Sequence, residues 1–391
     1  MLRLLTIALC ALVGGCTLYT SCPKGSESNG SSCVPVYDGS AAGGSGPVGS
    51  GGGSNSTGNL AGNAPTDPWM DATGSLTGMK PGFGNICYLS VKPDDDELIA
   101  GLAEAGLWAS TDGGETWEAM GSGKDSATIT NRPTTMIYDP DHSGVFWEAG
   151  TYGAGVFKTT DDGKTFTQLG KTEHNEHLAI DLSDPKRKTM LAAGHEQGRI
   201  LWLSTDGGST WTDIGDDLPA DATVCSYPIT LDSETFLISC TQNNSLPSGY
   251  GIFRSTDAGA SWVQVCEKPG WLAPLHASDG TIYWTLENGG SLLRSTDQGL
   301  SWEEVFSGGV LSMPPLELPS GRIVSATKDY LILSEDRGVH WRPVSSQLPF
   351  DPEGVAYSSS QKALFSWIVS TAEEIPPGEI QRFNFDDGAS P

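Results

Sequence analysis

The chain has 391 residues, and its composition excludes several classes of protein. It contains 50 glycines and 12 tryptophans but only 18% charged residues, which is typical of short strands joined by tight turns and not of helical or collagen-like chains. The formal charge of −26, from 22 basic and 48 acidic residues, offers no basic surface to a polyanion. The sequence therefore predicts an all-β protein that does not bind nucleic acid.

The first fifteen residues have the features of an export signal. Arg3 precedes an apolar run over residues 4–13, which has the length of a signal-peptide core and is too short to span a bilayer. Two glycines then precede Cys16, and this ending resembles the bacterial lipobox, in which the cysteine is acylated. We expect residues 1–15 to be removed and acyl chains on Cys16 to hold the protein at the cell envelope, at the outer membrane or cell surface if the cell is Gram-negative. The alternative is an ordinary signal peptide with an incidental cysteine.

Residues 16–65 are predicted to form a flexible tether. Residues 39–65 are rich in Gly, Ser, Asn and Ala and contain no charged side chain, so they cannot bury enough apolar surface to fold. A chain of this composition reaches on the order of 30 Å. The tether would hold a domain at residues 66–386 away from a membrane, and residues 387–391 would form a short C-terminal tail.

The cysteines suit an oxidising compartment. Six of the eight remain once the signal segment and the lipidated residue are set aside, and an even number in an exported protein permits disulfides. Cys22 and Cys33 would close a loop in the tether, whereas Cys225 and Cys240 would join the start of one strand to the end of its hairpin partner. Because no CxxC or Cys/His spacing supports a metal site, we expect no cofactor.

One motif recurs six times between residues 110 and 341. It has the form Ser/Thr-x-Asp-x-Gly-x-x-aromatic, and successive aspartates lie 39 to 51 residues apart. Each copy lies between two short apolar runs, which is the pattern of a hairpin. The Asp and Ser/Thr side chains can accept backbone N–H bonds within the turn, while the glycine adopts the positive φ that closes it. We expect a structural and not a catalytic role for the six aspartates, which are Asp112, Asp161, Asp206, Asp257, Asp297 and Asp336.

The motif resembles the Asp-box, or BNR, repeat of β-propellers. Sialidases, sortilin-type Vps10 domains, xyloglucan-cleaving hydrolases and photosystem II assembly factors of the Ycf48 kind share this repeat. The resemblance covers residues 84–345 and implies blades of four antiparallel strands, with the Asp-box between the third and fourth strands. About 320 residues at about 45 per blade make seven blades. The seventh blade lacks an Asp-box, and we expect residues 68–72 to supply its fourth strand and close the ring.

The third blade concentrates the candidate functional residues. In propellers, the ligand face usually carries the loops between blades and the loops that join the second and third strands. The candidates on this face are His174, Glu176, His177, His195, Glu196, Tyr152 and Arg132. Three imidazoles beside carboxylates suit a divalent metal or general acid–base catalysis, and the alternative is a solvated loop whose histidines never meet. The sequence alone assigns no metal ligand and no catalytic residue.

Two classes of function remain open. The favoured interpretation is a monomeric, non-enzymatic binding or assembly module of the cell envelope, which contacts the membrane only through its lipid anchor and presents an acidic face to a protein or glycan. It is favoured because the sequence yields no complete catalytic constellation.

The alternative is a glycoside hydrolase or another carbohydrate-active enzyme of the sialidase-like superfamily. A glycosidase needs two carboxyl groups across a pocket, one of them with a raised pKa. A sialidase is disfavoured because the Phe/Tyr-Arg-Ile/Leu-Pro motif of that family is absent from the chain. The xyloglucan-cleaving relatives place their catalytic acids between two propellers, and the repeats of this chain suffice for one.

Overall fold

The computed structural model describes residues 26–28, 33–35, 62–121, 129–220, 222, 224–241, 250–286, 291–306 and 311–389. The chain divides into two units, residues 1–55 and 56–391. In the first unit, β1 (Ser26–Ser28) and β2 (Cys33–Pro35) pair as an antiparallel hairpin. Within these described ranges, no helix is long and apolar enough to cross a membrane.

The predictions for the N-terminal segment fall largely outside this description. The expected export signal, the acyl chains on Cys16, the Cys22–Cys33 pair and most of the expected tether lie outside the described residues. They stay predictions.

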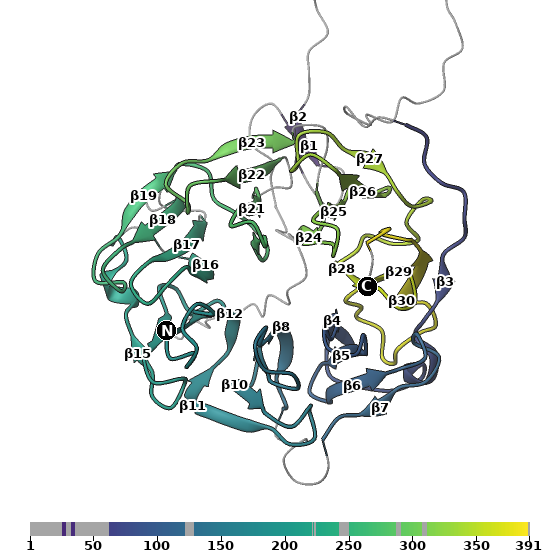
Figure 1. Ribbon diagram of the computed structural model, residues 1–391, viewed down its shortest axis with the longest axis horizontal. Coiled ribbons are helices and arrows are strands. Elements are labelled where there is room, and N and C mark those ends of the chain that lie inside the picture. The colour runs from purple at the N-terminus through teal and green to yellow at the C-terminus, as the bar shows by residue number, and fades with distance from the viewer. Residues whose placement is uncertain are drawn as a thin grey trace, which may run out of the picture. The chain divides into compact units, whose positions relative to one another are not determined.

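Seven four-stranded antiparallel sheets in the second unit form the blades of a ring (Figure 1), so the predicted seven-bladed β-propeller is confirmed. In every blade the first strand listed lies nearest the centre. Blades 1 to 3 consist of β4 (Ile86–Val91), β5 (Leu98–Leu102), β6 (Gly106–Ser110) and β7 (Glu118–Ala119); β8 (Arg132–Tyr138), β9 (Phe146–Thr151), β10 (Ala154–Thr159) and β11 (Thr167–Glu173); and β12 (Asn175–Ile180), β13 (Met190–Gly194), β14 (Leu201–Ser204) and β15 (Thr212–Asp213).

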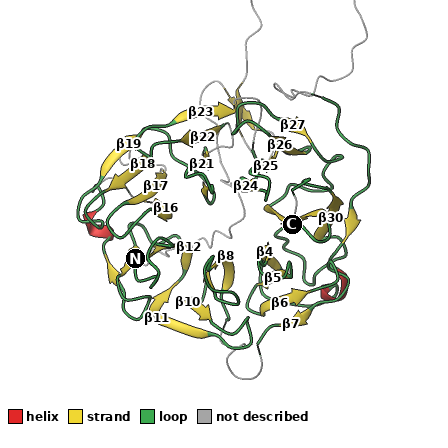
Figure 2. Ribbon diagram, in the orientation of Figure 1, coloured by secondary structure: helices red, strands yellow, loops and turns green. Residues whose placement is uncertain are grey.

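The remaining blades repeat this order. Blades 4 to 6 consist of β16 (Val224–Thr230), β17 (Phe236–Thr241), β18 (Gly251–Ser255) and β19 (Val263–Cys266); β20 (Leu275–His276), β21 (Ile282–Thr285), β22 (Leu292–Ser295) and β23 (Glu303–Phe306); and β24 (Leu316–Glu317), β25 (Ile323–Ala326), β26 (Leu331–Ser334) and β27 (Arg342–Pro343). Blade 7 consists of β28 (Gly354–Ser358), β29 (Ala363–Trp367), β30 (Ile380–Asn384) and β3 (Met70–Asp71). In the part of the chain that the structure describes, the strands are joined by loops and by the short 3-10 helices η1 (Gly74–Leu76) and η3 (Gly215–Asp217), drawn in red in Figure 2.

The ring is closed by the first strand of the propeller, as predicted. β3 pairs with β30 through Met70 opposite Arg382 and Asp71 opposite Gln381. The backbone N–H of Ala72 continues the ladder to the carbonyl of Ile380 at 2.9 Å. The last blade therefore combines strands from both ends of the unit, which leaves no open sheet edge at the seam.

The Asp-box turns join the third and fourth strands. In blade 1, Ser110 Oγ donates to Asp112 Oδ1 at 2.8 Å and accepts the N–H of Gly114 at 2.9 Å, while Asp112 accepts the N–H of Thr116 at 2.9 Å. The other five boxes repeat these bonds. Because residues 116 and 117 belong to this turn, β7 begins only at Glu118.

The hydrophobic core lies mainly between neighbouring blades. Ile99 and Leu107 of blade 1 form one cluster with Met136, Phe146 and Phe157 of blade 2, all nearly inaccessible to solvent. Each central strand is covered by a blade on both sides, so second strands such as β5 and β13 are buried along their whole length. The packing fixes the inner strands around the axis, where the functional site lies.

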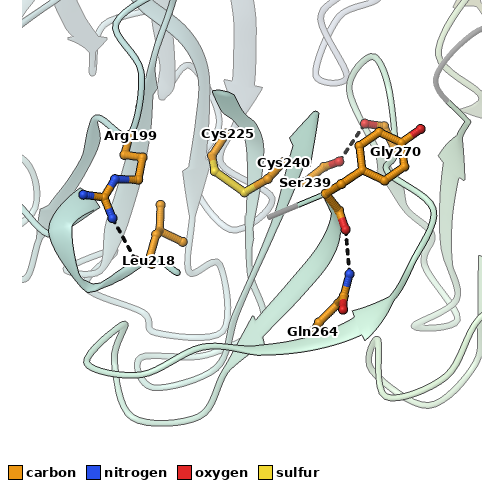
Figure 3. The surroundings of a disulfide bond; sticks show 8 residues. Arg199, Leu218, Cys225, Ser239, Cys240, Gln264 and Gly270 are labelled. Carbon is orange, nitrogen blue, oxygen red and sulfur yellow. Dashed lines mark hydrogen bonds between the residues drawn. A yellow bond between two sulfur atoms is a disulfide. The ribbon is translucent and has the colours of Figure 1, made fainter. Parts of the chain in front are cut away.

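A disulfide joins the two inner strands of blade 4. Cys225 on β16 lies opposite Cys240 on β17, and the two are bonded, which confirms this predicted pair (Figure 3). The neighbouring Ser239 hydroxyl donates to the carbonyl of Gly270 at 2.7 Å and so ties blade 4 to the segment that enters blade 5. Among the described cysteines, Cys87 and Cys266 are free thiols.

Candidate functional site

A cavity of 380 Å³ lies on the axis of the propeller, at the end where the inner strands begin. This volume falls within the range of small-molecule sites, about 300–1,000 Å³. All seven blades contribute to its wall. The residues that line it include Cys87, Thr134, Glu176, His177, Tyr227, Leu275, Leu316, Glu353 and Trp367.

A repeated β-bulge directs side chains into this cavity. The pairing of inner strand with second strand is interrupted once in each of blades 1 to 4, at a position that leaves Cys87, Thr134, Glu176 and Tyr227 without a partner in the register. A bulge inserts an extra residue and re-aims its side chain. All four residues line the cavity, so the site depends on the same irregularity in four successive blades.

The structure brings most of the predicted candidates together at the rim. The ring of Tyr152 lies 4.6 Å from that of His174 and 5.3 Å from that of His195, centroid to centroid. On its other side, the guanidinium carbon of Arg132 lies 5.2 Å from the Tyr152 ring centre. The Tyr152 hydroxyl also donates to Glu196 at 3.5 Å. Three loops of blades 2 and 3 and the first residue of β8 thus meet at one tyrosine.

Glu176 is held by donors on both carboxylate oxygens. His195 Nδ1 hydrogen-bonds to Oε2, and the Tyr227 hydroxyl donates to Oε1 at 3.2 Å. Burial opposes ionisation of Glu176, but the hydrogen bond and charge of His195 and the Tyr227 bond outweigh it, so the pKa of Glu176 is lowered. Burial likewise opposes protonation of His195. The hydrogen bond and the negative charge of Glu176 outweigh this effect, so the pKa of His195 is raised. Glu176 is therefore a carboxylate that is kept ionised.

Glu353 lines the same cavity, but its surroundings shift the pKa of its carboxyl group in the opposite direction to that of Glu176. It immediately precedes β28, and its backbone N–H donates to the carbonyl of Trp367 at 2.9 Å. The residue is exposed to solvent, but the surrounding protein partly desolvates its carboxyl group. This desolvation, together with the negative charges of Asp351 and Glu176, raises the pKa of Glu353. Arg132 offsets only part of the effect. Glu353 is therefore a carboxyl group that retains its proton to higher pH.

His177 enters the channel and does not join the other two histidines. Its Nδ1 lies 3.0 Å from the Thr135 hydroxyl, and its ring lies 5.6 Å from that of Tyr227. Burial lowers the pKa of His177 to about 4, with a partial opposing effect of Glu176. His177 is consequently neutral near pH 7 and can serve as a hydrogen-bonding group on the cavity wall.

His174, His195 and Glu196 form the one group of described residues whose ligand atoms are spaced for a metal, all within 4.8 Å of one another. The hydrogen bonds of His174 disfavour this use. Its Nδ1 accepts the backbone N–H of Tyr152 at 2.8 Å, so the neutral ring carries its proton on Nε2 and has no free lone pair to coordinate a metal. The rim cluster is thus better suited to hydrogen bonding than to holding an ion.

Three residues of the site were missed by the sequence-based reasoning. Glu353, Tyr227 and Cys87 all line the cavity, yet they lie at the start of inner strands and not in the loops from which candidates were chosen. Superposing the repeats on their Asp-box aspartates would have placed Tyr227 in register with Glu176, since each lies 30 residues before the aspartate of its blade. Comparison of the repeats could therefore have identified this position on the inner strand. The bulge that turns the side chains inward has no local sequence signature.

The comparisons with known proteins agree with the architecture. Residues 105–249 match the model of the Sortilin-Vps10 family, described as "Sortilin, neurotensin receptor 3". Together with the six Asp-boxes and the seven blades, this partial match supports the resemblance that the sequence predicts. The chain is a Vps10/BNR-like β-propeller.

The curated relatives of this Vps10/BNR-like propeller include xyloglucanases. A xyloglucanase of Paenibacillus sp is 25% identical over 270 residues, covering 58% of this chain and 25% of the relative. A xyloglucanase of Hypocrea jecorina is 23% identical over 369 residues, covering 82% of this chain and 40% of the relative. The chain spans about a quarter of the length of the relatives that it matches first.

Solved structures with the same fold include both large enzymes and a single propeller. The GH74 enzyme of Niastella koreensis gives a TM-score of 0.57 at 16% identity, over 86% of this chain and 55% of that one. YCF48 bound to D1 peptide gives 0.51 at 16% identity, over 85% of this chain and all of that one. At this identity the likeness concerns the fold alone.

These findings correct the interpretation favoured by the sequence. A non-enzymatic binding or assembly module is contradicted, because the relatives that the chain resembles along much of its length are xyloglucanases. That interpretation rested on the lack of a complete catalytic constellation. The cavity is lined by two carboxyl groups, Glu176 and Glu353, whose pKa values are shifted in opposite directions.

Proposed function

We propose that the protein is a glycoside hydrolase whose active site is the central cavity. One observation carries the proposal: Glu176 and Glu353 line the same cavity, and their surroundings lower the pKa of the first and raise the pKa of the second. Two carboxyl groups whose pKa values are driven apart can divide the roles of acid and base between them. Glycosidases require this division of roles.

Glu353 takes the role of general acid in this mechanism. In its protonated form it donates a proton to the glycosidic oxygen as the bond to the anomeric carbon breaks. The confinement that raises its pKa keeps the proton on the carboxyl group to higher pH than on an ordinary glutamate. The neighbouring charge of Glu176 contributes to this effect, so the two carboxyl groups sense each other across the cavity.

Glu176 acts on the other side of the bond. In its ionised form it removes a proton from the attacking water or attacks the anomeric carbon itself, depending on the separation of the two carboxyl groups with substrate bound. His195 and Tyr227 donate to its two oxygens and thereby orient the carboxylate. They act as positioning residues, because they reach the reaction through Glu176.

The proposed substrate is a β-linked glucan of the xyloglucan type. The support for this class of sugar is the similarity to xyloglucanases, which extends over 82% of this chain in the Hypocrea jecorina protein. The proposed position of the active site differs from the position between two propellers that the resemblance implies, and it rests on the carboxyl pair of the cavity alone. The channel wall is suited to sugar rings because aromatic and aliphatic side chains alternate on it with polar ones. Examples are Tyr88, Trp367, Leu275, Thr134 and His177.

The test is hydrolysis of xyloglucan by the wild type and by Glu353→Gln and Glu176→Gln, followed as release of reducing sugar. Each substitution removes one ionisable group at nearly constant shape, and we expect kcat to fall by about 10²–10⁴-fold. Glu104→Gln, an exposed carboxyl on a turn of blade 1, is the matched control and should retain wild-type activity. Wild-type protein that releases no sugar, or Gln variants as active as the control, would refute the proposal.

A further inference from the structure

A second cavity of 580 Å³ lies near the axis, beyond the candidate active site. Along β4, the 380 Å³ cavity is lined by residues 87–89 and the larger cavity by residues 88–91. Because β4 runs from the loop face toward the end that carries the Asp-box turns, the larger cavity lies on the Asp-box side. The 380 Å³ cavity is called the upper cavity below, and the 580 Å³ cavity is called the lower cavity.

The lower cavity opens on the Asp-box face. Part of its wall is formed by the turns that join the first and second strands of blades 1, 5, 6 and 7, and five lining residues of these turns are exposed to solvent. They are Pro93, Ser278, Pro319, Gly321 and Ser359. Other lining residues, such as Leu318 and Ala356, are buried. A ligand therefore reaches the lower cavity from this face without passing through the upper one.

An apolar collar lies where the two cavities meet. Five residues line both cavities, and four of them have side chains without a hydrogen-bond donor; the collar consists of Tyr88, Leu89, Met136, Leu316 and Val355. A sugar that passed this collar would lose water from its hydroxyl groups without gaining equivalent hydrogen bonds, which is costly. The two carboxyl groups of the proposed active site line the upper cavity only. The lower cavity is therefore a separate site.

Hydrogen bonds between blades fix the mouth of the lower cavity. The Asp96 carboxylate accepts the backbone N–H groups of Ser359 at 2.9 Å and Ser360 at 3.0 Å, which joins blade 1 to blade 7. The Glu317 carboxylate accepts the backbone N–H of Ser278 at 2.7 Å and its hydroxyl at 2.8 Å, which joins blade 6 to blade 5. The mouth is thus preformed, so binding of a ligand does not carry the cost of ordering it.

The lining of the lower cavity disfavours anionic ligands. Among the described residues that line it, Asp96 and Glu317 have carboxylate side chains and none is Lys or Arg. A negative charge on a ligand would meet these two carboxylates in a partly enclosed space, where charges interact more strongly than in water. Aliphatic side chains, prolines and tyrosines form most of the remaining wall.

Tyr357 provides a directional polar contact in this apolar wall. Its hydroxyl accepts the backbone N–H of Asp387 at 3.0 Å, and it still has its own proton to donate. Desolvation raises the pKa of Tyr357, so the phenol keeps this proton at neutral pH. A ligand with an apolar body and a hydrogen-bond acceptor matches these features.

We propose that the lower cavity is a second binding site, which takes an uncharged and largely apolar small molecule from the Asp-box face. Its volume of 580 Å³ falls within the range of small-molecule sites, about 300–1,000 Å³. Burial of the ligand's apolar surface against the collar supplies the affinity, and the Tyr357 hydroxyl orients the ligand. The site is distinct from the carboxyl pair, and its occupancy does not depend on glycan hydrolysis.

A matched pair of dyes tests the class of ligand. N-phenyl-1-naphthylamine is uncharged, and 8-anilinonaphthalene-1-sulfonate has the same aromatic frame with an added sulfonate; both fluoresce more strongly in apolar surroundings. The uncharged dye should saturate at one site per wild-type chain and bind about tenfold more tightly than the sulfonate, or better. No saturable binding of the uncharged dye, or a sulfonate that binds as tightly, would overturn the proposal.

Glu317→Gln separates charge from apolarity in this comparison. The amide keeps a hydrogen-bond acceptor for Ser278 and removes one of the two negative charges, so the sulfonate should gain affinity relative to the uncharged dye. An unchanged ratio of the two affinities would contradict the selection against anions.

Variants that fill one cavity or the other locate the dye. Val91→Phe and Ser359→Trp enlarge residues of blades 1 and 7 that line the lower cavity only, whereas Ala273→Phe enlarges a residue that lines the upper cavity only. The first two should weaken binding of the uncharged dye about tenfold or more, and Ala273→Phe should leave it unchanged. Urea unfolding identifies the folded variants, and two positions on separate blades guard against a single folding failure. Wild-type affinity in the folded lower-cavity variants, or loss of binding in Ala273→Phe alone, would overturn the proposal.

Discussion

Glu148 makes the stability of the propeller depend on pH. This residue of β9 is fully buried, and of its two oxygens only Oε2 has a partner, the Asn131 amide at 3.3 Å. Burial raises the pKa of Glu148 from 4.5 to about 8, with a small opposing effect of the Asn131 bond. The folded protein therefore binds this proton more tightly than the unfolded chain does.

The sign of the effect follows from proton linkage. Stability from the protonated side chain is fully present below the unfolded pKa near 4.5 and is lost as the pH rises through about 8. A rise of the pKa from 4.5 to about 8 corresponds to at most about 5 kcal/mol of stability lost over that interval. Local opening that admits water would reduce the loss.

The perturbation is Glu148→Gln, which keeps the shape and removes the titration. Urea unfolding at pH 5, 7 and 9 should show the variant close to wild type at pH 5 and more stable by several kcal/mol, on the order of 2–5, at pH 9. The exposed Glu173→Gln on the same blade should track wild type at every pH. Parallel stability curves for wild type and Glu148→Gln would refute the reasoning.

Three further predictions concern the site and the scaffold. His195→Ala removes the bond and charge that hold Glu176 ionised, so the low-pH limb of activity should move to higher pH; an unmoved limb would contradict the positioning role. Asp112→Ala removes an acceptor of four hydrogen-bonding groups and should lower the free energy of unfolding by about 1–3 kcal/mol, measured in urea against the exposed Asp217→Ala. The Cys225→Ala/Cys240→Ala pair opens a crosslink spanning 15 residues and should cost about 3 kcal/mol, so an unchanged melting temperature would argue against its contribution.

The architecture could be predicted because each blade repeats its own local chemistry. Asp112 and its five counterparts form their turns with side chains four residues apart or closer. All the residues that define an Asp-box turn therefore lie within eight consecutive positions of the sequence. The closure of the ring was also accessible, since residues 68–72 resemble the fourth strand of blade 1. The fold could be predicted because the same short motif recurs six times along the chain.

The chemistry of the site was harder to infer because it depends on contacts across the ring. Glu176 was recognised beside its histidines, which are near it in sequence, but Glu353 lies 177 residues farther along the chain and approaches only when blade 7 closes the circle. Its raised pKa arises from enclosure by the finished propeller and from Glu176 itself. Of the causes of the raised pKa, only the charge of Asp351 is visible in the residues that flank Glu353.

The pH dependence of kcat/KM for xyloglucan hydrolysis tests the central claim most directly. Activity should require Glu176 to be ionised and Glu353 to be protonated, which gives a bell-shaped profile with an acidic limb set by the first and an alkaline limb set by the second. Glu353→Gln should leave a weak residual activity without the alkaline limb. A profile that keeps both limbs in this variant, or wild-type protein that does not hydrolyse the polymer at any pH, would contradict the account.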